Sequence, residues 1–174
     1  SCMRLFTAVN FNDSILDSLQ ASINALKARG VSGSFSRREN LHVTVVFIGE
    51  TSRVPDIKAA FESVSSRPFT LRLGGLGLFH GGTLWCGVEK NPVLNDVHSR
   101  LSSGLKQFGF KPEERPFSPH LTVCREALFP TGLDVKTLSP LFPELSAEIN
   151  RVSLMRSEHV NGMLTYTEIY AKEL

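Results

Sequence analysis

Two short stretches of the sequence place a histidine two residues before a threonine within an apolar run. They are LHVTVVF, residues 41–47, and SPHLTVC, residues 118–124. Because successive strand residues point to opposite faces, His42 and Thr44 share one face of an expected strand, and His120 and Thr122 share one face of another. One such motif alone is more typical of a structural histidine on a sheet surface, with its ring nitrogens hydrogen bonded. Two are expected by chance in only about one sequence in a thousand of this composition.

A pair of histidines with neighbouring hydroxyls suits displacement at a phosphodiester. Imidazole titrates near neutral pH, so one neutral and one protonated ring can act together as base and acid. One ring activates the nucleophile and the other protonates the leaving oxygen. The hydroxyls of Thr44 and Thr122 can donate hydrogen bonds to the non-bridging oxygens as charge develops. This chemistry needs no metal, and we expect no cofactor.

The other histidines and the cysteine beside the second motif fit structural positions better. His80 lies in a glycine-rich turn, His98 on a helix beside its apolar stripe, and His159 near an Asn-Gly turn, so all three are expected at the surface. Alternation places Cys124 on the same face as the second motif. No orienting partner for a Cys/His nucleophile is evident, so we interpret Cys124 as a buried or cleft-edge thiol.

The elements that must hold the two motifs occur twice in the same order. A helix over 13–29 separates expected strands over 3–11 and 41–50. In the second half, strands over 83–90 and 120–126 flank a helix that begins at Pro92 and stops at Gly109. The repetition predicts an α+β fold with two pseudo-symmetric lobes of antiparallel sheet and outer helices around a central cleft.

The remaining segments complete these lobes. We expect a loop over 30–40, a helix from Pro55 to about Ser65, a strand over 69–79, a short helix around 134–141 and two final strands. The final strands are joined at Asn161-Gly162, a strong hairpin signal. Residues 1–174 are therefore expected to form a single two-lobed domain, with Ser1 and Cys2 before Met3 interpreted as a cloning remnant.

Composition indicates an ordinary globular protein. The hydrophobic fraction is 41%, the charged fraction 21% and the net charge +2, which excludes a strongly basic nucleic-acid coat but permits a short polyanion at a local site. The three cysteines make no disulfide framework, and no run approaches the roughly 20 apolar residues of a membrane span. No signal peptide is evident, so we expect a cytoplasmic protein, with no membrane and no protein partner implied.

The paired tetrads His42-Val43-Thr44-Val45 and His120-Leu121-Thr122-Val123 resemble the signature of the 2H phosphoesterases. More narrowly, the chain resembles the LigT-like RNA 2′,3′-cyclic phosphodiesterases, also called 2′-5′ RNA ligases. The resemblance covers nearly the whole chain and is carried by MRLFTAVNF, ENLHVTVVFIGE, GLGLF with TLWCGVE, PFSPHLTVCR, and VSLMRSE followed by a tyrosine-bearing last strand. It implies the two-lobed 2H fold.

The resemblance also implies a reaction. The expected substrates are RNA ends or nucleotides that bear a 2′,3′-cyclic phosphate, the product is a 2′-phosphate, and the same site can run in reverse as an ATP-independent 2′-5′ ligase. His42 would protonate the departing 3′ oxygen and His120 would activate water. These two roles can exchange with the direction of the reaction.

Phe47 and Arg125 each lie five residues after a motif histidine. The resemblance implies that they flank the terminal base, where stacking is worth about 1–3 kcal/mol per base, and that Arg125 also meets phosphate. An odd offset points both side chains away from the histidine face unless a β-bulge or strand end intervenes. The alternative is that Phe47 is a core residue and Arg125 a surface ion-pair partner.

Two other functions are compatible with the same residues. The chain could be a nucleotide-binding module that keeps the fold without turnover, although the presence of all four polar tetrad residues favours an enzyme. It could also be a metallo-hydrolase, a reading weakened because neither tetrad has a cluster of carboxylate and histidine ligands nearby.

Overall fold

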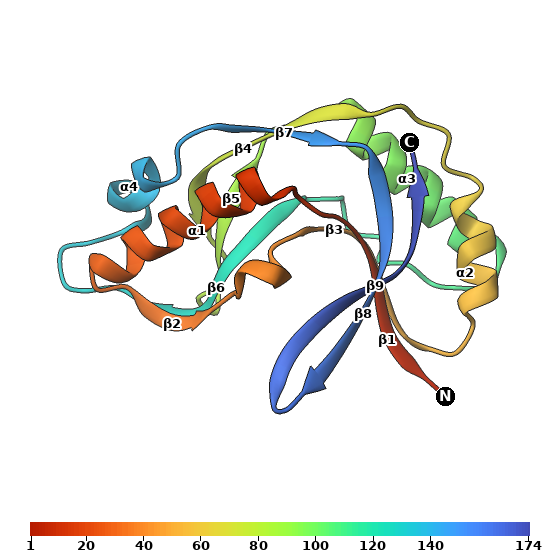
Figure 1. Cartoon of the computed structure of the whole chain (residues 1–174), viewed down its shortest axis with the longest axis horizontal. Coiled ribbons are helices and arrows are strands. Elements are labelled where there is room, and N and C mark those ends of the chain that lie inside the picture. Colours follow the sequence, from red (N-terminus) through yellow and green to blue (C-terminus); the bar gives the residue numbers. More distant parts are fainter.

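Two antiparallel sheets form the fold, and a computed structural model describes all residues from 1 to 174 (Figure 1). Sheet A has the strand order β3-β1-β8-β9, and sheet B has the order β2-β6-β5-β4-β7. The elements are β1 (Met3–Val9), α1 (Asp13–Ala28), β2 (Ser32–Phe35), η1 (Arg38–Asn40), β3 (Val43–Thr51), α2 (Val54–Phe61), β4 (Phe69–Leu78), β5 (Leu84–Val88), α3 (Pro92–Gln107), β6 (His120–Leu128), α4 (Val135–Leu138), η2 (Ser139–Leu141), β7 (Leu145–Ile149), β8 (Arg151–Val160) and β9 (Met163–Glu173). The expected α+β fold of antiparallel lobes is confirmed.

The two tetrads lie on equivalent strands of different sheets. His42 directly precedes β3, which pairs with β1, whereas His120 begins β6, which pairs with β5. Each tetrad strand is thus the antiparallel neighbour of the strand that came one long helix earlier. β3 and β6 contact each other near the centre of the molecule (Figure 1). The duplicated order in the sequence therefore brings the two motifs face to face.

Each long helix covers the sheet that does not contain the strand before it. α1 follows β1 of sheet A, yet the Lys27 ammonium lies 5.0 Å from the ring centroid of Phe35 in sheet B. α3 follows β5 of sheet B, yet His98 Nδ1 lies 2.9 Å from the carbonyl oxygen of Val45 in sheet A. Figure 1 accordingly shows α1 on one side of the molecule and α2 with α3 on the other. Because each long helix packs on the sheet of the other lobe, the two lobes are held together.

Apolar periodicity and capping explain the helices. In α1, Ile15, Leu19, Ile23 and Leu26 are buried, and the Asn12 side chain accepts a hydrogen bond from a first-turn backbone N–H. Asn91 caps α3 in the same way. The two sheets and their helices share one continuous core of 34 buried residues. No helix is long and apolar enough to cross a membrane.

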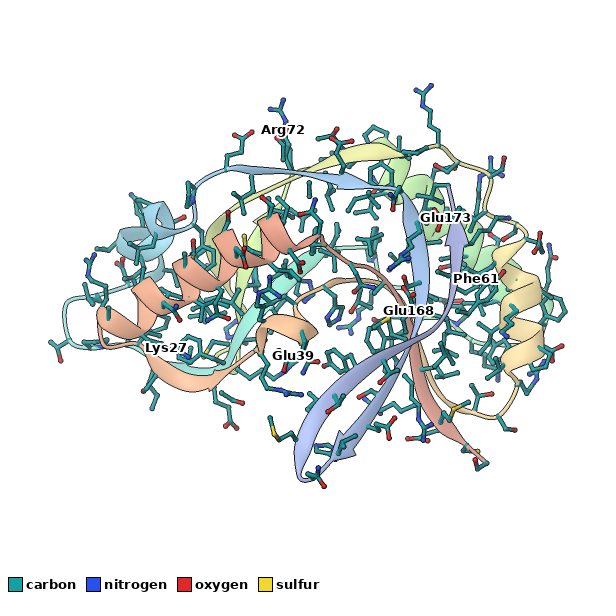
Figure 2. The ribbon with its side chains drawn as sticks, viewed as in Figure 1. Lys27, Glu39, Phe61, Arg72, Glu168 and Glu173 are labelled. Carbon is teal, nitrogen blue, oxygen red and sulfur yellow. The ribbon has the colours of Figure 1, made fainter.

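Two local expectations differ from the structure. α2 ends at Phe61 instead of continuing to about Ser65, and just beyond this end the Ser63 hydroxyl donates to the carbonyl oxygen of Ala60 at 2.6 Å, a local side-chain bond that competes with further helix. The buried Phe61 ring packs edge-on against Tyr170 of β9 and attaches α2 to sheet A (Figure 2). The expected loop over 30–40 contains β2, which forms only because β6 offers it a pairing edge.

Candidate active site

A β-bulge follows the threonine of each tetrad. In the ladder between β1 and β3, Val45 has no residue opposite it, and in the ladder between β5 and β6, Val123 has none. An extra residue reverses the alternation of the strand beyond it, so Phe47 and Arg125 turn onto the faces that carry the histidines. The β-bulge that Phe47 and Arg125 require to reach the histidine faces is therefore present in both strands.

Neither structural alternative for these two residues fits their surroundings. The Phe47 side chain is 48% exposed, so Phe47 is not a core residue. Arg125 is exposed and has no carboxylate partner, so it is not a surface ion-pair residue. The charge of Arg125 instead acts on the imidazole of His42, whose pKa it helps to lower.

Two hydrogen bonds fix the ring of His42. Its Nδ1 lies 2.7 Å from the carbonyl oxygen of Asn40, so Nδ1 carries a proton and donates it to that carbonyl. Its Nε2 lies 3.0 Å from Oγ1 of Thr44. The ring also packs against Phe6 and Tyr166, with centroid separations of 5.0 and 5.1 Å. The backbone therefore sets the tautomer, and Nε2 is the nitrogen available for proton transfer.

The ring of His120 is held in a parallel way. Its Nδ1 lies 2.9 Å from the carbonyl oxygen of Ser118, again the residue two positions earlier. The ring of Phe79 packs edge-on against it with a centroid separation of 4.9 Å, and the centroid of the Trp85 ring lies 6.4 Å away. Both tetrads thus direct an Nε2 atom away from the backbone, each with an aromatic edge against the ring.

Both histidines line one cleft with a volume of about 300 Å³ between the two sheets. All six residues predicted from the sequence line it: His42, Thr44, Phe47, His120, Thr122 and Arg125. Hollows of about 570 and 220 Å³ adjoin it, the larger towards α3 and the smaller towards the β8–β9 hairpin. No carboxylate lines the central cleft, and no group of three or more His, Cys, Asp or Glu side chains could hold a metal ion.

Burial lowers the pKa of His42 below its ordinary value of 6.5, because the charged imidazolium loses solvation beneath the two aromatic rings. The hydrogen bond to the Asn40 carbonyl opposes this effect, and the charges of Arg125 and His120 lower the pKa further. The free protein therefore holds His42 mainly as a neutral imidazole at neutral pH. Its Nε2 then accepts a hydrogen bond from the Thr44 hydroxyl.

The structure adds four residues that the sequence did not single out. Arg4, Phe79 and Tyr166 line the cleft. Asn40 is buried, and its side chain donates to the carbonyl oxygen of Leu164 at 2.8 Å and accepts from the backbone N–H of Tyr166 at 3.2 Å. Asn40 thereby ties β9 to the loop that holds His42. Its place two residues before the histidine was the only local signal.

Two expectations about other side chains need correction. The bulge at Val123 moves Cys124 off the face of His120, whereas its interpretation as a buried thiol is confirmed, because Cys124 is fully buried in the core. His98 is not a free surface residue, because it hydrogen bonds to Val45 and stacks on Phe117 with a centroid separation of 4.1 Å. His80 and His159 are exposed, as expected.

Comparison with known proteins identifies the family. The model of the 2′-5′ RNA ligase superfamily matches residues 15–161. The chain belongs to this superfamily. An RNA 2′,3′-cyclic phosphodiesterase of Methanothermobacter thermautotrophicus is 30% identical over 96% of each chain, and one of Archaeoglobus fulgidus is 33% identical over 71% of this chain and 72% of its own. The resemblance of the chain to this family is therefore confirmed, and the protein is an enzyme of the RNA 2′,3′-cyclic phosphodiesterase class.

Two solved structures share the fold of this chain. Escherichia coli LigT in complex with 3′-AMP superposes with a TM-score of 0.80 at 23% identity, covering 100% of this chain and 99% of LigT. A protein of Thermus thermophilus superposes with a TM-score of 0.75 at 24% identity, covering 99% of this chain and 98% of its own. Both proteins thus share the overall fold of this chain.

Proposed function

We propose that this protein hydrolyses RNA-terminal 2′,3′-cyclic phosphates to 2′-phosphates by histidine acid–base catalysis that requires no metal ion. The observation that carries the proposal is the cleft itself. Two histidines from different sheets line it with their Nδ1 atoms bound to backbone carbonyls, and a threonine hydroxyl accompanies each. The relatives named RNA 2′,3′-cyclic phosphodiesterase support the substrate class.

The proposed step is an in-line displacement at phosphorus. Water forms the new P–O bond and loses a proton to Nε2 of His120, while the P–O3′ bond breaks and O3′ takes a proton from Nε2 of His42. The hydroxyls of Thr44 and Thr122 donate hydrogen bonds to the non-bridging oxygens as negative charge builds on them. Phe47 and Arg125 flank the terminal nucleotide, with the guanidinium close to the phosphate.

Burial of His42 fits the acid role once substrate is bound. The anionic phosphate favours the charged imidazolium, so His42 takes up its proton as the substrate enters the cleft. His120 faces the opposite side of the phosphorus and is left to accept the proton of water.

The proposal includes ATP-independent 2′-5′ ligation, in which a different nucleophile displaces O3′ from the same cyclic phosphate. When the 5′-hydroxyl of a second RNA takes the place of water, the product is a 2′-5′ phosphodiester, and no ATP is consumed because the cyclic phosphate is already activated. The hollow of about 570 Å³ beside His120 offers room for the second strand. The proposal places the activity in the cytoplasm, in keeping with three cysteines that form no disulfide.

Turnover of adenosine 2′,3′-cyclic phosphate with and without EDTA tests the proposal. Equal turnover under both conditions is the expected result. Loss of activity with EDTA and its return on addition of a divalent metal would show that catalysis depends on a metal. Tight binding of the nucleotide with no turnover would identify a binding module instead.

The lowered pKa of His42 predicts how activity depends on pH. To reach the transition state, the free enzyme must gain a proton on His42, and because the pKa of that ring lies below its ordinary value of 6.5, this becomes less favourable as pH rises through the weakly acidic range. We therefore expect kcat/KM to decrease above about pH 6.5, because kcat/KM reports the free enzyme. The corresponding limb of kcat should lie at higher pH, since bound phosphate favours the imidazolium. A kcat/KM that rises steadily from pH 6 to 8 would contradict this.

A further inference from the structure

Four arginines line the central cleft and its two adjoining hollows. Arg37 and Arg115 are each paired with a neighbouring glutamate. Arg4 and Arg125 line the central cleft, and the guanidinium group of neither forms an ion pair or a hydrogen bond with another residue of the chain. These two guanidinium groups are therefore the cations that the cleft offers to an anionic ligand.

Arg4 is held in place by an aromatic ring. It lies on β1, with its Cζ atom 4.7 Å from the centroid of the Phe47 ring. Glu50 is its partner in the β1–β3 ladder, yet the two side chains form no ion pair. A planar guanidinium stacked on an aromatic face keeps its N–H edges free for an oxyanion and loses little freedom on binding.

The two arginines stand on opposite walls of the cleft. Arg125 projects from sheet B into the cleft that His42 and His120 line, beside the position proposed for the reacting phosphate. Arg4 projects from sheet A beyond Phe47, the residue proposed to stack on the terminal base. A nucleoside 2′,3′-cyclic phosphate carries a single phosphate, which leaves Arg4 without an anion. An RNA end carries a second phosphate one nucleotide away.

We propose that Arg4 binds the phosphodiester that joins the terminal nucleotide to its 5′ neighbour, so that the site prefers RNA chain ends to free mononucleotides. The inference rests on the proposed function, because it takes the terminal cyclic phosphate to lie between the histidines. Phe47 then separates two anion sites, one on each wall. Arg4 acts as a specificity-determining residue for the length of the substrate and takes no part in proton transfer.

Arg4→Gln tests this with two substrates, adenosine 2′,3′-cyclic phosphate and the dinucleotide ApA that ends in a 2′,3′-cyclic phosphate. For the dinucleotide we expect kcat/KM to fall about tenfold, through KM, because a charge-assisted contact to phosphate is lost. For the mononucleotide we expect a change of less than about twofold. The salt dependence of kcat/KM for the dinucleotide should also weaken, by about 0.7 in the log–log slope, as one phosphate contact is removed.

Arg156→Gln is the matched control. Arg156 lies on β8 beside Ser157, and because Ser157 lines the cleft, alternation points Arg156 to the opposite face, where it pairs with Glu158 at 3.2 Å. Arg156→Gln removes the same charge as Arg4→Gln, and it should leave kcat/KM unchanged for both substrates. Arg4→Lys should restore part of the preference for the dinucleotide.

An equal loss of kcat/KM on both substrates, or no loss on either, would overturn the role of Arg4. The dissociation constants of the two products, 2′-AMP and the dinucleotide with a terminal 2′-phosphate, provide the same comparison without turnover. If the wild-type protein turns over neither cyclic substrate, the proposed function fails, while the ratio of dissociation constants in Arg4→Gln still decides the role of Arg4.

Discussion

Replacing either His42 or His120 with alanine is expected to lower kcat on adenosine 2′,3′-cyclic phosphate about 10³-fold, because general acid–base catalysis by a positioned side chain contributes about 10²–10⁴. The measurement is steady-state turnover with folding checked by circular dichroism. His159→Ala is the matched control, since His159 is exposed on β8 outside the cleft. Near-normal turnover in either tetrad variant would end the acid–base mechanism.

The order of the two roles has its own test. In a substrate whose 3′ oxygen is replaced by sulfur, the leaving group departs as a thiolate. It needs little help from an acid, because a thiol is far more acidic than an alcohol. We expect this substrate to restore much of the activity of His42→Ala and little of that of His120→Ala. The opposite pattern would show that His120 is the acid and His42 the base.

The second large effect is expected for the threonines. Thr44→Val and Thr122→Val keep the shape of the side chain and remove the hydroxyl, so each should lower kcat about 10²-fold, the usual cost of one donor to a developing oxyanion. Thr→Ser at each position should retain most activity and is the matched control. Turnover by both valine variants within about twofold of wild type would show that the hydroxyls do not contact the transition state.

The two valine variants should differ in their pH dependence. Thr44 hydrogen bonds to Nε2 of His42 at 3.0 Å, whereas no other residue of the chain hydrogen bonds to the Thr122 hydroxyl. Losing a donor to the neutral ring makes the charged ring relatively more favourable, so Thr44→Val should move the basic limb of kcat/KM to higher pH. Thr122→Val should leave that limb in place. A shift of equal size in both variants would contradict this assignment.

Much of the site could be predicted because its signals are local. His42 and Thr44 share a face by simple alternation, as do His120 and Thr122, and the helices follow from apolar periodicity and Asn caps. The repeated order of strand, helix and motif strand predicted that the two histidines would meet. These inferences needed no knowledge of which strands pair.

Other features depend on tertiary pairing that no local pattern encodes. Val45 and Val123 resemble any strand residue, and only the ladders show that each is a bulge. The contact of Asn40 with Leu164 spans 124 positions of the chain. The position of Arg4 over Phe47 likewise requires β1 and β3 to be neighbours with a shifted register. Such residues support the catalytic pair and could be found only in the structure.

The two bulges have a functional consequence. Without them, alternation would keep Phe47 and Arg125 on the opposite face of their strands from the histidines. With them, each motif strand presents an imidazole, a hydroxyl and the side chain of Phe47 or Arg125 to the cleft from one face. The β-bulge in each sheet therefore brings all six residues of the proposed substrate site to one cleft.

The most direct test of the central claim is to identify the product formed from a short RNA that ends in a 2′,3′-cyclic phosphate. Phosphorus NMR or chromatography against authentic standards distinguishes a terminal 2′-phosphate from a 3′-phosphate. Breakage of the P–O3′ bond by the histidine pair predicts the 2′-phosphate as the sole product, formed equally with and without EDTA. A 3′-phosphate, or an unchanged cyclic end, would contradict the proposed reaction.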